Sequence, residues 1–191
     1  SDGRRSAPSR PVDAGADLRR MDKMSPLKMT IAPGFLREGE LALELLRFEL
    51  HAAHRVPTYQ FHMVHSETRE VLGNLRLSLG STPHLERYAG HIGYGVLPEH
   101  RGHHYAARAV RLVLPFAHKA GLNPLWITCD PENLASRRTL ELAGAEFVEI
   151  VDVPEDCIIH HNGHPRKCRY RLPSGSSPAN HQLSAFTACG R

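Results

Sequence analysis

The stretch HIGYGVLPEHRGHHYAARA, His91–Ala109, decides the fold of this 191-residue chain. Side chains alternate in character up to Leu97, which predicts a strand over 90–97 that Pro98 ends. An apolar stripe at helical spacing predicts a helix over 102–120. Backbone N–H groups that open into a helix N-terminus can bind an anion, so the basic turn between strand and helix is a predicted anion site.

The predicted strand contains two glycines, Gly93 and Gly95, on the same face as His91. Glycines inside a strand weaken it and usually mark a bulge or the close approach of a ligand to the backbone. Alternatively, Gly95 only relieves tight packing against a neighbouring segment, which explains the same pattern of glycines without a ligand. Both interpretations stay open at the level of the sequence.

Upstream of this stretch, the sequence predicts a short strand over 27–31, a helix and a hairpin. Leu41, Leu45 and Phe48 are spaced as on one helical face, so a helix is predicted from Glu38 until Pro57 interrupts it. Alternation of apolar residues over 58–80 then predicts a hairpin of two strands.

Downstream, strands and a helix alternate. Asp130 and Pro131 are typical of an N-cap and first helical residue, and Gly144 of a helix stop. The predicted elements are a strand over 125–129, a helix to Ala143, a strand over 147–153, an irregular loop over 154–166 and a strand over 167–172. Together these predict a single α/β domain over 26–173.

The two ends of the chain differ in composition from this domain. Residues 1–25 and 174–191 are polar and lack periodicity, so we expect both to be disordered tails. The net charge of +4 suits an acidic ligand such as a nucleotide phosphate. The sequence lacks the dense blocks of Lys and Arg that are typical of a nucleic-acid-binding protein. The cysteines are scattered and no signal segment is visible, which predicts a cytoplasmic protein. No apolar run is long enough for a membrane span, so we expect neither a membrane nor a nucleic acid as a partner.

Two motifs resemble one family. PEHRGHHYA, over 98–106, resembles the pyrophosphate-binding loop of the GNAT superfamily of acyl-CoA-dependent N-acetyltransferases, and NLASRRTLELAGA, over 133–145, resembles its Asn-x-x-Ser segment. The matching region spans about 59–171. The GHIGY segment looks most like the RimJ/RimL branch of ribosomal-protein acetyltransferases, and the ending EDC…KCRYR resembles uncharacterised bacterial members.

This resemblance implies a fold and a cofactor site. The implied fold is a mixed, mostly antiparallel central sheet flanked by helices, with a bulged fourth strand splayed from the next. The implied co-substrate is acetyl-CoA, which would transfer its acetyl group to a primary amine. The residues implied to contact it are Gly95, Val96 and Leu97 for the pantetheine arm, and Arg101, Gly102, His103, His104, Tyr105 and Ala106 for the pyrophosphate. Asn133 is implied to reach the arm from the start of the second motif, with Ser136 one helical turn on.

The catalytic groups are predicted from the same comparison. His91 is the first candidate for the general base that takes a proton from the amine, with Glu86 and Glu149 as alternatives. Ser136 or Tyr105 is the candidate donor of a proton to the departing thiolate. A tyrosine that many members use for this purpose falls at Leu140 here.

One departure from the family pattern lies in the phosphate loop. His104 stands where the family has a glycine, so its side chain must point away from the phosphates or the turn must shift. Because of His104 and of Leu140 in place of the tyrosine, a domain that binds acyl-CoA as a sensor, with weak or no catalysis, is kept as the alternative function.

The remaining predictions concern metals and partners. Cys157, His160, His161 and His164 are close in sequence, but their spacing matches no structural zinc pattern, and we expect no metal. The acceptor amine could belong to a small molecule, a lysine or a protein N-terminus, and a homodimer is compatible with the sequence. The predicted acceptor pocket draws on the first helix and on the loops 80–90 and 154–166.

Overall fold

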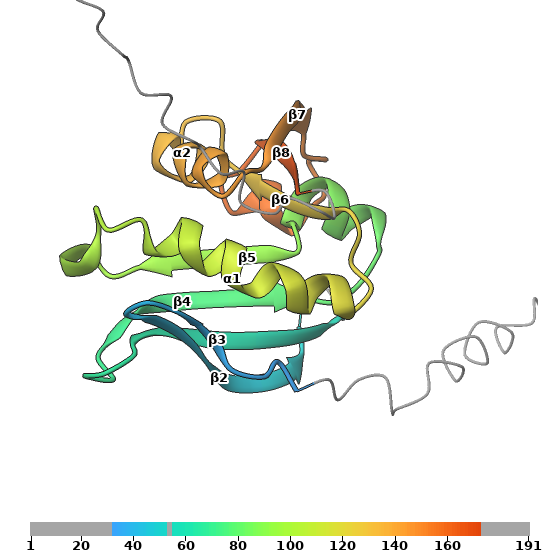
Figure 1. Cartoon of the computed structure of the whole chain (residues 1–191). Helices are drawn as coiled ribbons and strands as arrows, with labels where there is room; N and C mark the ends of the chain where they lie inside the picture. Colours follow the sequence, from blue (N-terminus) through green and yellow to red (C-terminus); the bar gives the residue numbers. More distant parts are fainter. Residues whose placement is uncertain (1–31, 53–54, 173–191) are drawn as a thin grey trace, which may run out of the picture. The chain divides into compact units, whose positions relative to one another are not determined.

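The computed structural model describes residues 32–52 and 55–172 of the chain. The predicted strand over 27–31 and the predicted tails 1–25 and 174–191 lie outside the described residues. Two sheets form the described fold, one of five strands in the order β1-β2-β3-β4-β5 and one of three in the order β6-β8-β7 (Figure 1). No helix among the described residues is long and apolar enough to cross a membrane.

The five-stranded sheet is antiparallel throughout. Its strands are β1 (Leu36–Glu38), β2 (Leu41–Leu50), β3 (Pro57–His65), β4 (Val71–Ser78) and β5 (Ile92–Val96). The predicted hairpin over 58–80 is confirmed as β3 and β4, and the predicted strand over 90–97 as β5. A short helical turn, η3 (Leu85–Ala89), connects β4 to β5.

The predicted helix from Glu38 is wrong, because this segment forms β1 and β2. The pairing of β2 with β3 shifts register between Leu45 and Arg47, which adds one residue to β2. The shift puts Leu43, Leu45 and Phe48 opposite Met63, Phe61 and Tyr59, all on one face of the sheet. A bulge thus gave a strand the three-to-four-residue apolar spacing that we interpreted as helical.

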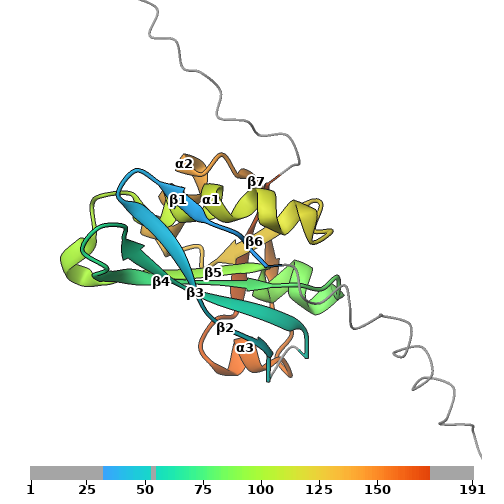
Figure 2. The ribbon, with the colours of Figure 1, turned by 60° about the horizontal axis from the view of Figure 1, so that its bottom comes forward.

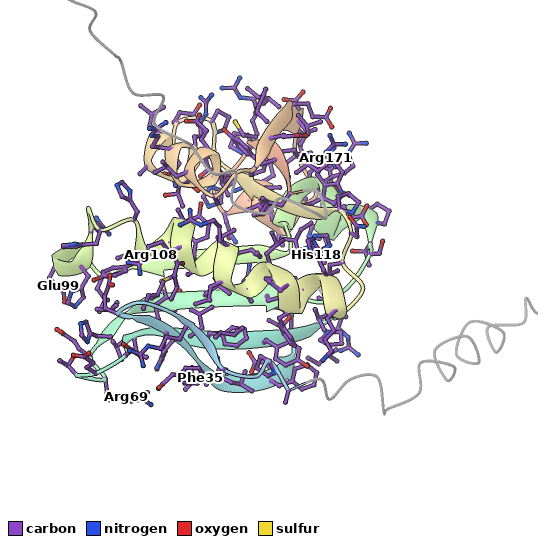
Figure 3. All side chains as sticks on the ribbon, in the orientation of Figure 1. Phe35, Arg69, Glu99, Arg108, His118 and Arg171 are labelled. Carbon is purple, nitrogen blue, oxygen red and sulfur yellow. The ribbon has the colours of Figure 1, made fainter. Side chains whose placement is uncertain are left out.

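Helix α1 (Tyr105–Lys119) confirms the predicted amphipathic helix and packs on one face of the sheet (Figure 2). The Phe116 ring meets Tyr59 of β3 edge-on, with 5.0 Å between ring centroids. Arg108, labelled in Figure 3, donates to a carboxylate oxygen of Glu40 and, over 2.7 Å, to the carbonyl of Glu38. The opposite face of the sheet carries polar side chains of β3 and β4, namely Gln60, His62, Asn74 and Arg76.

The second sheet consists of β6 (Leu125–Cys129), β7 (Glu146–Asp152) and β8 (Arg166–Leu172), and all three were predicted. Helix α2 (Leu134–Leu142) begins later than expected, because Asn133 is its N-cap. The carboxylate of Asp130, our predicted cap, instead accepts a hydrogen bond from Lys167 Nζ over 2.7 Å and lies 2.8 Å from His164 Nδ1. The predicted irregular loop contains the short helix α3 (Ile158–His161).

The two sheets meet at one point and then separate. The backbone N–H of His91 donates to the carbonyl of Trp126 over 2.7 Å, but β5 and β6 belong to different sheets beyond it. The predicted splay of β5 from the next strand is therefore present. The predicted bulge in this strand is not, since β4 and β5 pair from Leu77–Ile92 to Gly73–Val96 without a register shift.

Candidate active site

The edge of β5 that faces β6 presents unpaired backbone groups. The N–H of Leu97 donates to Leu72 over 2.9 Å, and antiparallel pairing alternates along a strand. Gly93, Gly95 and Leu97 therefore direct their backbone to β4, whereas Tyr94 and Val96 direct theirs to the opening between the sheets. Of the three residues predicted for the pantetheine arm, Val96 alone directs its backbone to this edge, where its carbonyl accepts a hydrogen bond from Arg101 and its N–H has no partner among the described residues.

The turn after β5 supplies a group of free backbone donors. Among the residues that the structure describes, none accepts a backbone hydrogen bond from the N–H groups of residues 102–106, which precede or open α1. Arg101 folds back and donates from Nε to the carbonyl of Val96 over 3.2 Å. Free N–H groups at the positive end of a helix dipole are the elements of an anion site.

His104 keeps the backbone shape that a glycine usually provides. Its φ is +57°, in the left-handed region, next to Gly102 at +89°. Histidine is one of the non-glycine residues enriched in this region. Both His103 and His104 are exposed, and the His103 ring stacks on Tyr105 with 5.4 Å between centroids. The exposed His104 side chain thus leaves the turn and its N–H groups in place.

Tyr105, a predicted proton donor, lies in the first turn of α1 and is 8% exposed. Besides the His103 ring, it contacts the guanidinium of Arg108, 5.7 Å from the ring centroid. These contacts give the ring a packing role. The predicted role of Tyr105 as a proton donor to the thiolate stays a prediction.

His91 is buried, with 1% of its surface exposed, and both ring nitrogens contact backbone groups. The N–H of Trp126 donates to Nδ1 over 2.9 Å, so Nδ1 carries no proton and Nε2–H donates to the carbonyl of Gly80 over 2.9 Å. Burial lowers the pKa of the imidazole, and the hydrogen bonds to Gly80 and Trp126 and the Glu86 charge oppose this only in part. A ring with both nitrogens engaged has none left for an amine proton, so we do not retain His91 as the proposed base.

The two alternative bases are also engaged. A carboxylate oxygen of Glu86 accepts a hydrogen bond from Ser81 Oγ over 2.5 Å. Glu149 accepts one from Arg169, whose guanidinium lies 4.1 Å from the centroid of the Trp126 ring. The structure therefore ties each carboxylate to a neighbouring side chain.

Ser136 and Tyr94 meet across the opening between β5 and α2. The Ser136 N–H donates to Oδ1 of Asn133 over 2.9 Å, and Ser136 Oγ lies 2.9 Å from the hydroxyl of Tyr94. Burial raises the pKa of Tyr94 to about 12, so the phenol keeps its proton at neutral pH. Tyr94 was not predicted as a site residue, because its alternation in β5 marked it only as part of an apolar face.

Cys129 lies beside this pair and interacts with Ser136, and Leu140 lies on the same helix as Ser136. Leu140 is fully buried, so the position at which many relatives carry a tyrosine belongs to the core here. Burial raises the pKa of the Cys129 thiol to about 11, which keeps it protonated and weakly nucleophilic.

A pocket of about 510 Å³ lies on the polar face of the five-stranded sheet. It begins at Gly93 and Tyr94 of β5 and extends over β4 and β3 to the end of β2. Its polar lining residues are Glu49, His51, Gln60, His62, Asn74 and Arg76. Because the predicted first helix is absent, this pocket differs from the predicted acceptor site, and its walls are strands.

The histidine-rich loop after β7 divides its contacts among separate partners. Cys157 Sγ lies 3.9 Å from Nδ1 of His84, whereas His164 pairs with Asp130. Across residues 32–52 and 55–172, no three His, Cys, Asp or Glu side chains are grouped as metal ligands.

A model of the acetyltransferase (GNAT) domain matches residues 14–146, more than half of the chain. The chain belongs to the GNAT acetyltransferase family. The match includes β5, the turn and the start of α1 described above, and it ends at the start of β7. No curated protein matches the chain.

Two solved structures show the same fold at low identity, each with a TM-score above 0.5. The ribosomal-protein-S5-alanine acetyltransferase from Vibrio fischeri is 14% identical with a TM-score of 0.55, over 74% of this chain and 97% of that one. A probable GNAT acetyltransferase from Chromobacterium violaceum is 16% identical with a TM-score of 0.55, over 90% and 97%. A GNAT acetyltransferase from Bacillus anthracis is 22% identical with a TM-score of 0.47, and this chain covers 65% of it.

Proposed function

We propose that this protein is an acetyl-CoA-dependent N-acetyltransferase that moves an acetyl group to a primary amine by direct attack within a ternary complex. One observation carries the proposal: the unpaired β5 edge opens toward β6 and leads to a turn of free N–H groups at the start of α1. A thin arm that ends in a pyrophosphate matches this arrangement, because extended backbone binds the arm and the helix N-terminus binds the phosphates.

The residues of the opening would divide the work as follows. Val96 would bind the pantetheine arm through its backbone N–H, and residues 102–106 would bind the pyrophosphate through their N–H groups. The free N–H of Tyr94 would polarise the acetyl carbonyl. Asn133 would hold Ser136 through the N-cap, and the predicted contact of Asn133 with the cofactor stays part of the proposal.

The transfer itself forms one bond and breaks another. The amine nitrogen bonds to the thioester carbonyl carbon, the carbon–sulfur bond breaks, and sulfur leaves with the electron pair. Ser136, hydrogen-bonded to Tyr94, would give a proton to this sulfur and regain one from solvent. The amine loses its proton to solvent, since His91 is sequestered. Burial raises the pKa of the thiols of Cys129 and Cys168, which is consistent with a route that needs no covalent enzyme intermediate.

The position of His91 is the observation that favours the alternative, an acyl-CoA-binding protein without turnover. Release of free thiol from acetyl-CoA with a panel of primary amines separates the two functions. We expect CoA to raise the melting temperature and at least one amine to give thiol release. Stabilisation by CoA without turnover on any amine would establish the binding protein, and no stabilisation at all would refute both.

The finer predictions rest on the sequence. Membership of the RimJ/RimL branch, a cytoplasmic location and a homodimer belong to this proposal. The shared fold of the ribosomal-protein acetyltransferase is compatible with that branch, but at 14% identity it supports the fold alone.

A further inference from the structure

Arg76 is the cation of the pocket on the polar sheet face. It lies on β4, opposite Gly93 of β5 and Gln60 of β3. A Cβ atom added to Gly93 would lie 3.2 Å from Nη2 of Arg76, so the guanidinium lies directly over the β5 backbone. This places a positive charge beside the strand to which our proposed function assigns the thioester.

The charge of Arg76 has no carboxylate partner among residues 32–52 and 55–172. Its Nη1 lies 3.3 Å from Nε2 of His51, and its buried Nε has no hydrogen-bond partner within the described chain. The carboxylate that lines the pocket, that of Glu49, accepts a hydrogen bond from Gln60 and pairs with Arg47 at 3.2 Å. Burial alone lowers the pKa of Arg76, which reflects the cost of holding this cation away from water.

A half-buried guanidinium without a counter-ion is costly unless a ligand supplies the anion. Its planar fork binds carboxylate and phosphate groups through paired hydrogen bonds. The Nε atom adds to this cost, because it is covered from solvent and makes no hydrogen bond within the described chain. Gly93 keeps the surface under the fork flat, because any side chain there would contact the guanidinium.

We propose that the acceptor amine carries an oxyanion, a carboxylate or a phosphate, which Arg76 binds in the pocket of strands β2–β5. This inference rests on the proposed acetyltransferase function and names the class of its acceptor. The oxyanion occupies the pocket over β4 while the amine lies toward the edge of β5. Neutral amines and polyamines are therefore poor acceptors.

The test compares amines in matched pairs that differ in the oxyanion. The pairs are γ-aminobutyrate with its carboxamide, the dipeptide Ala-Glu with Ala-Gln, and O-phosphoethanolamine with ethanolamine. We expect the anionic member of at least one pair to have a kcat/KM at least about 10-fold higher, as for a charged hydrogen bond. Arg76→Gln should remove this preference mainly through KM, by lowering the kcat/KM of the anionic member far more than that of the neutral member, and Arg76→Lys should restore part of it.

A control variant and a binding measurement complete the test. Arg138→Gln removes an exposed arginine of α2 that pairs with Glu141, so it should keep the preference. In the presence of CoA, the anionic amines should raise the melting temperature of the wild-type protein more than that of Arg76→Gln. Turnover of amines without any anionic preference overturns this inference and leaves the acetyltransferase function standing.

Two further outcomes also decide the matter. An equal loss of activity on both members of a pair in Arg76→Gln would show a structural role for the arginine and overturn the inference. A preference for succinyl-CoA over acetyl-CoA that Arg76→Gln abolishes would assign the guanidinium to the acyl donor and overturn it too. No thiol release with any amine and no stabilisation by CoA would instead refute the proposed function.

Discussion

Trp126 and His91 exchange two hydrogen bonds across the line where the sheets meet. The Trp126 N–H donates to the His91 ring over 2.9 Å, and the His91 N–H donates to the Trp126 carbonyl over 2.7 Å. The His91 ring also donates to Gly80 in the loop before η3. One side chain therefore fixes the end of β5 against β6 and against the preceding loop.

His91→Ala is expected to destabilise the fold, because it leaves the Trp126 N–H and the Gly80 carbonyl buried without partners. Two such losses cost about 3 kcal/mol together, which should lower the melting temperature by roughly 6–12 °C for a domain of this size. Differential scanning calorimetry measures the change. His103→Ala, at an exposed position, is the control and should change the melting temperature little.

The free energy of unfolding should also depend on pH, because the folded protein holds the His91 ring in its neutral form. The folded pKa of His91 lies below its unfolded value of 6.5, so its contribution is complete above pH 6.5 and is lost as pH falls below it. Urea titrations of the wild type should therefore show a falling free energy of unfolding on acidification, and His91→Gln should show a shallower fall. An identical slope in both proteins would contradict the buried, neutral imidazole.

The Glu40–Arg108 pair predicts an effect at lower pH. The hydrogen bond from Arg108, with the Arg108 charge also contributing, lowers the pKa of Glu40 from 4.5 to about 2. Because the folded value is the lower one, this stabilisation is present above pH 4.5 and is lost as pH falls toward 2. Glu40→Gln should flatten the acid limb of a thermal-melt series in this range, whereas Glu141→Gln, in the exposed pair with Arg138, should leave it as in the wild type.

His104→Gly is expected to stabilise the turn that precedes α1. A non-glycine residue in the left-handed region costs about 1 kcal/mol, and glycine removes that cost at φ +57°. The melting temperature should rise and CoA should bind at least as tightly, by calorimetric titration. His103→Gly serves as the comparison, since its φ is not positive; an equal gain there would argue against relief of strain.

Tyr94→Phe and Ser136→Ala probe the hydroxyl pair at the opening. We expect each to lower kcat about 10-fold with little change in CoA affinity, because a thiolate needs modest help to leave. In the proposed mechanism Tyr94 acts through Ser136, so Tyr94→Phe should also shift the alkaline limb of the kcat–pH profile. Unchanged kcat in Ser136→Ala would remove Ser136 from the proposed chemistry.

Most of the fold could be predicted because its signals are local. The apolar stripe of α1 follows from helical spacing, and the β3–β4 hairpin follows from alternation. The β2 segment could not be predicted, since a bulge at Leu46 depends on pairing with β3 and imitates helical spacing locally. The start of α2 was misplaced because Asp130 pairs with Lys167, which lies far away in sequence.

The features of the candidate site also differ in how far they could be predicted from the sequence. Backbone features of the loop, such as the free N–H groups of 102–106, follow from local sequence. The environment of His91 does not, since its partners Trp126 and Gly80 come from other segments. Arg76 was missed because an arginine in an alternating strand has the pattern of any solvent-facing residue, and only the register with Gly93 brings it over β5.

The junction at His91 and Trp126 makes the opening between the sheets a wedge with one closed end. Along β5, each residue adds about 3.3 Å of distance from that end, so a chain lying on this strand meets a fixed stop beyond its reactive tip. In the proposed orientation, the tip is the acyl group. The closed end of the wedge would then limit the length of the acyl group, so that an acetyl group fits and longer acyl chains do not.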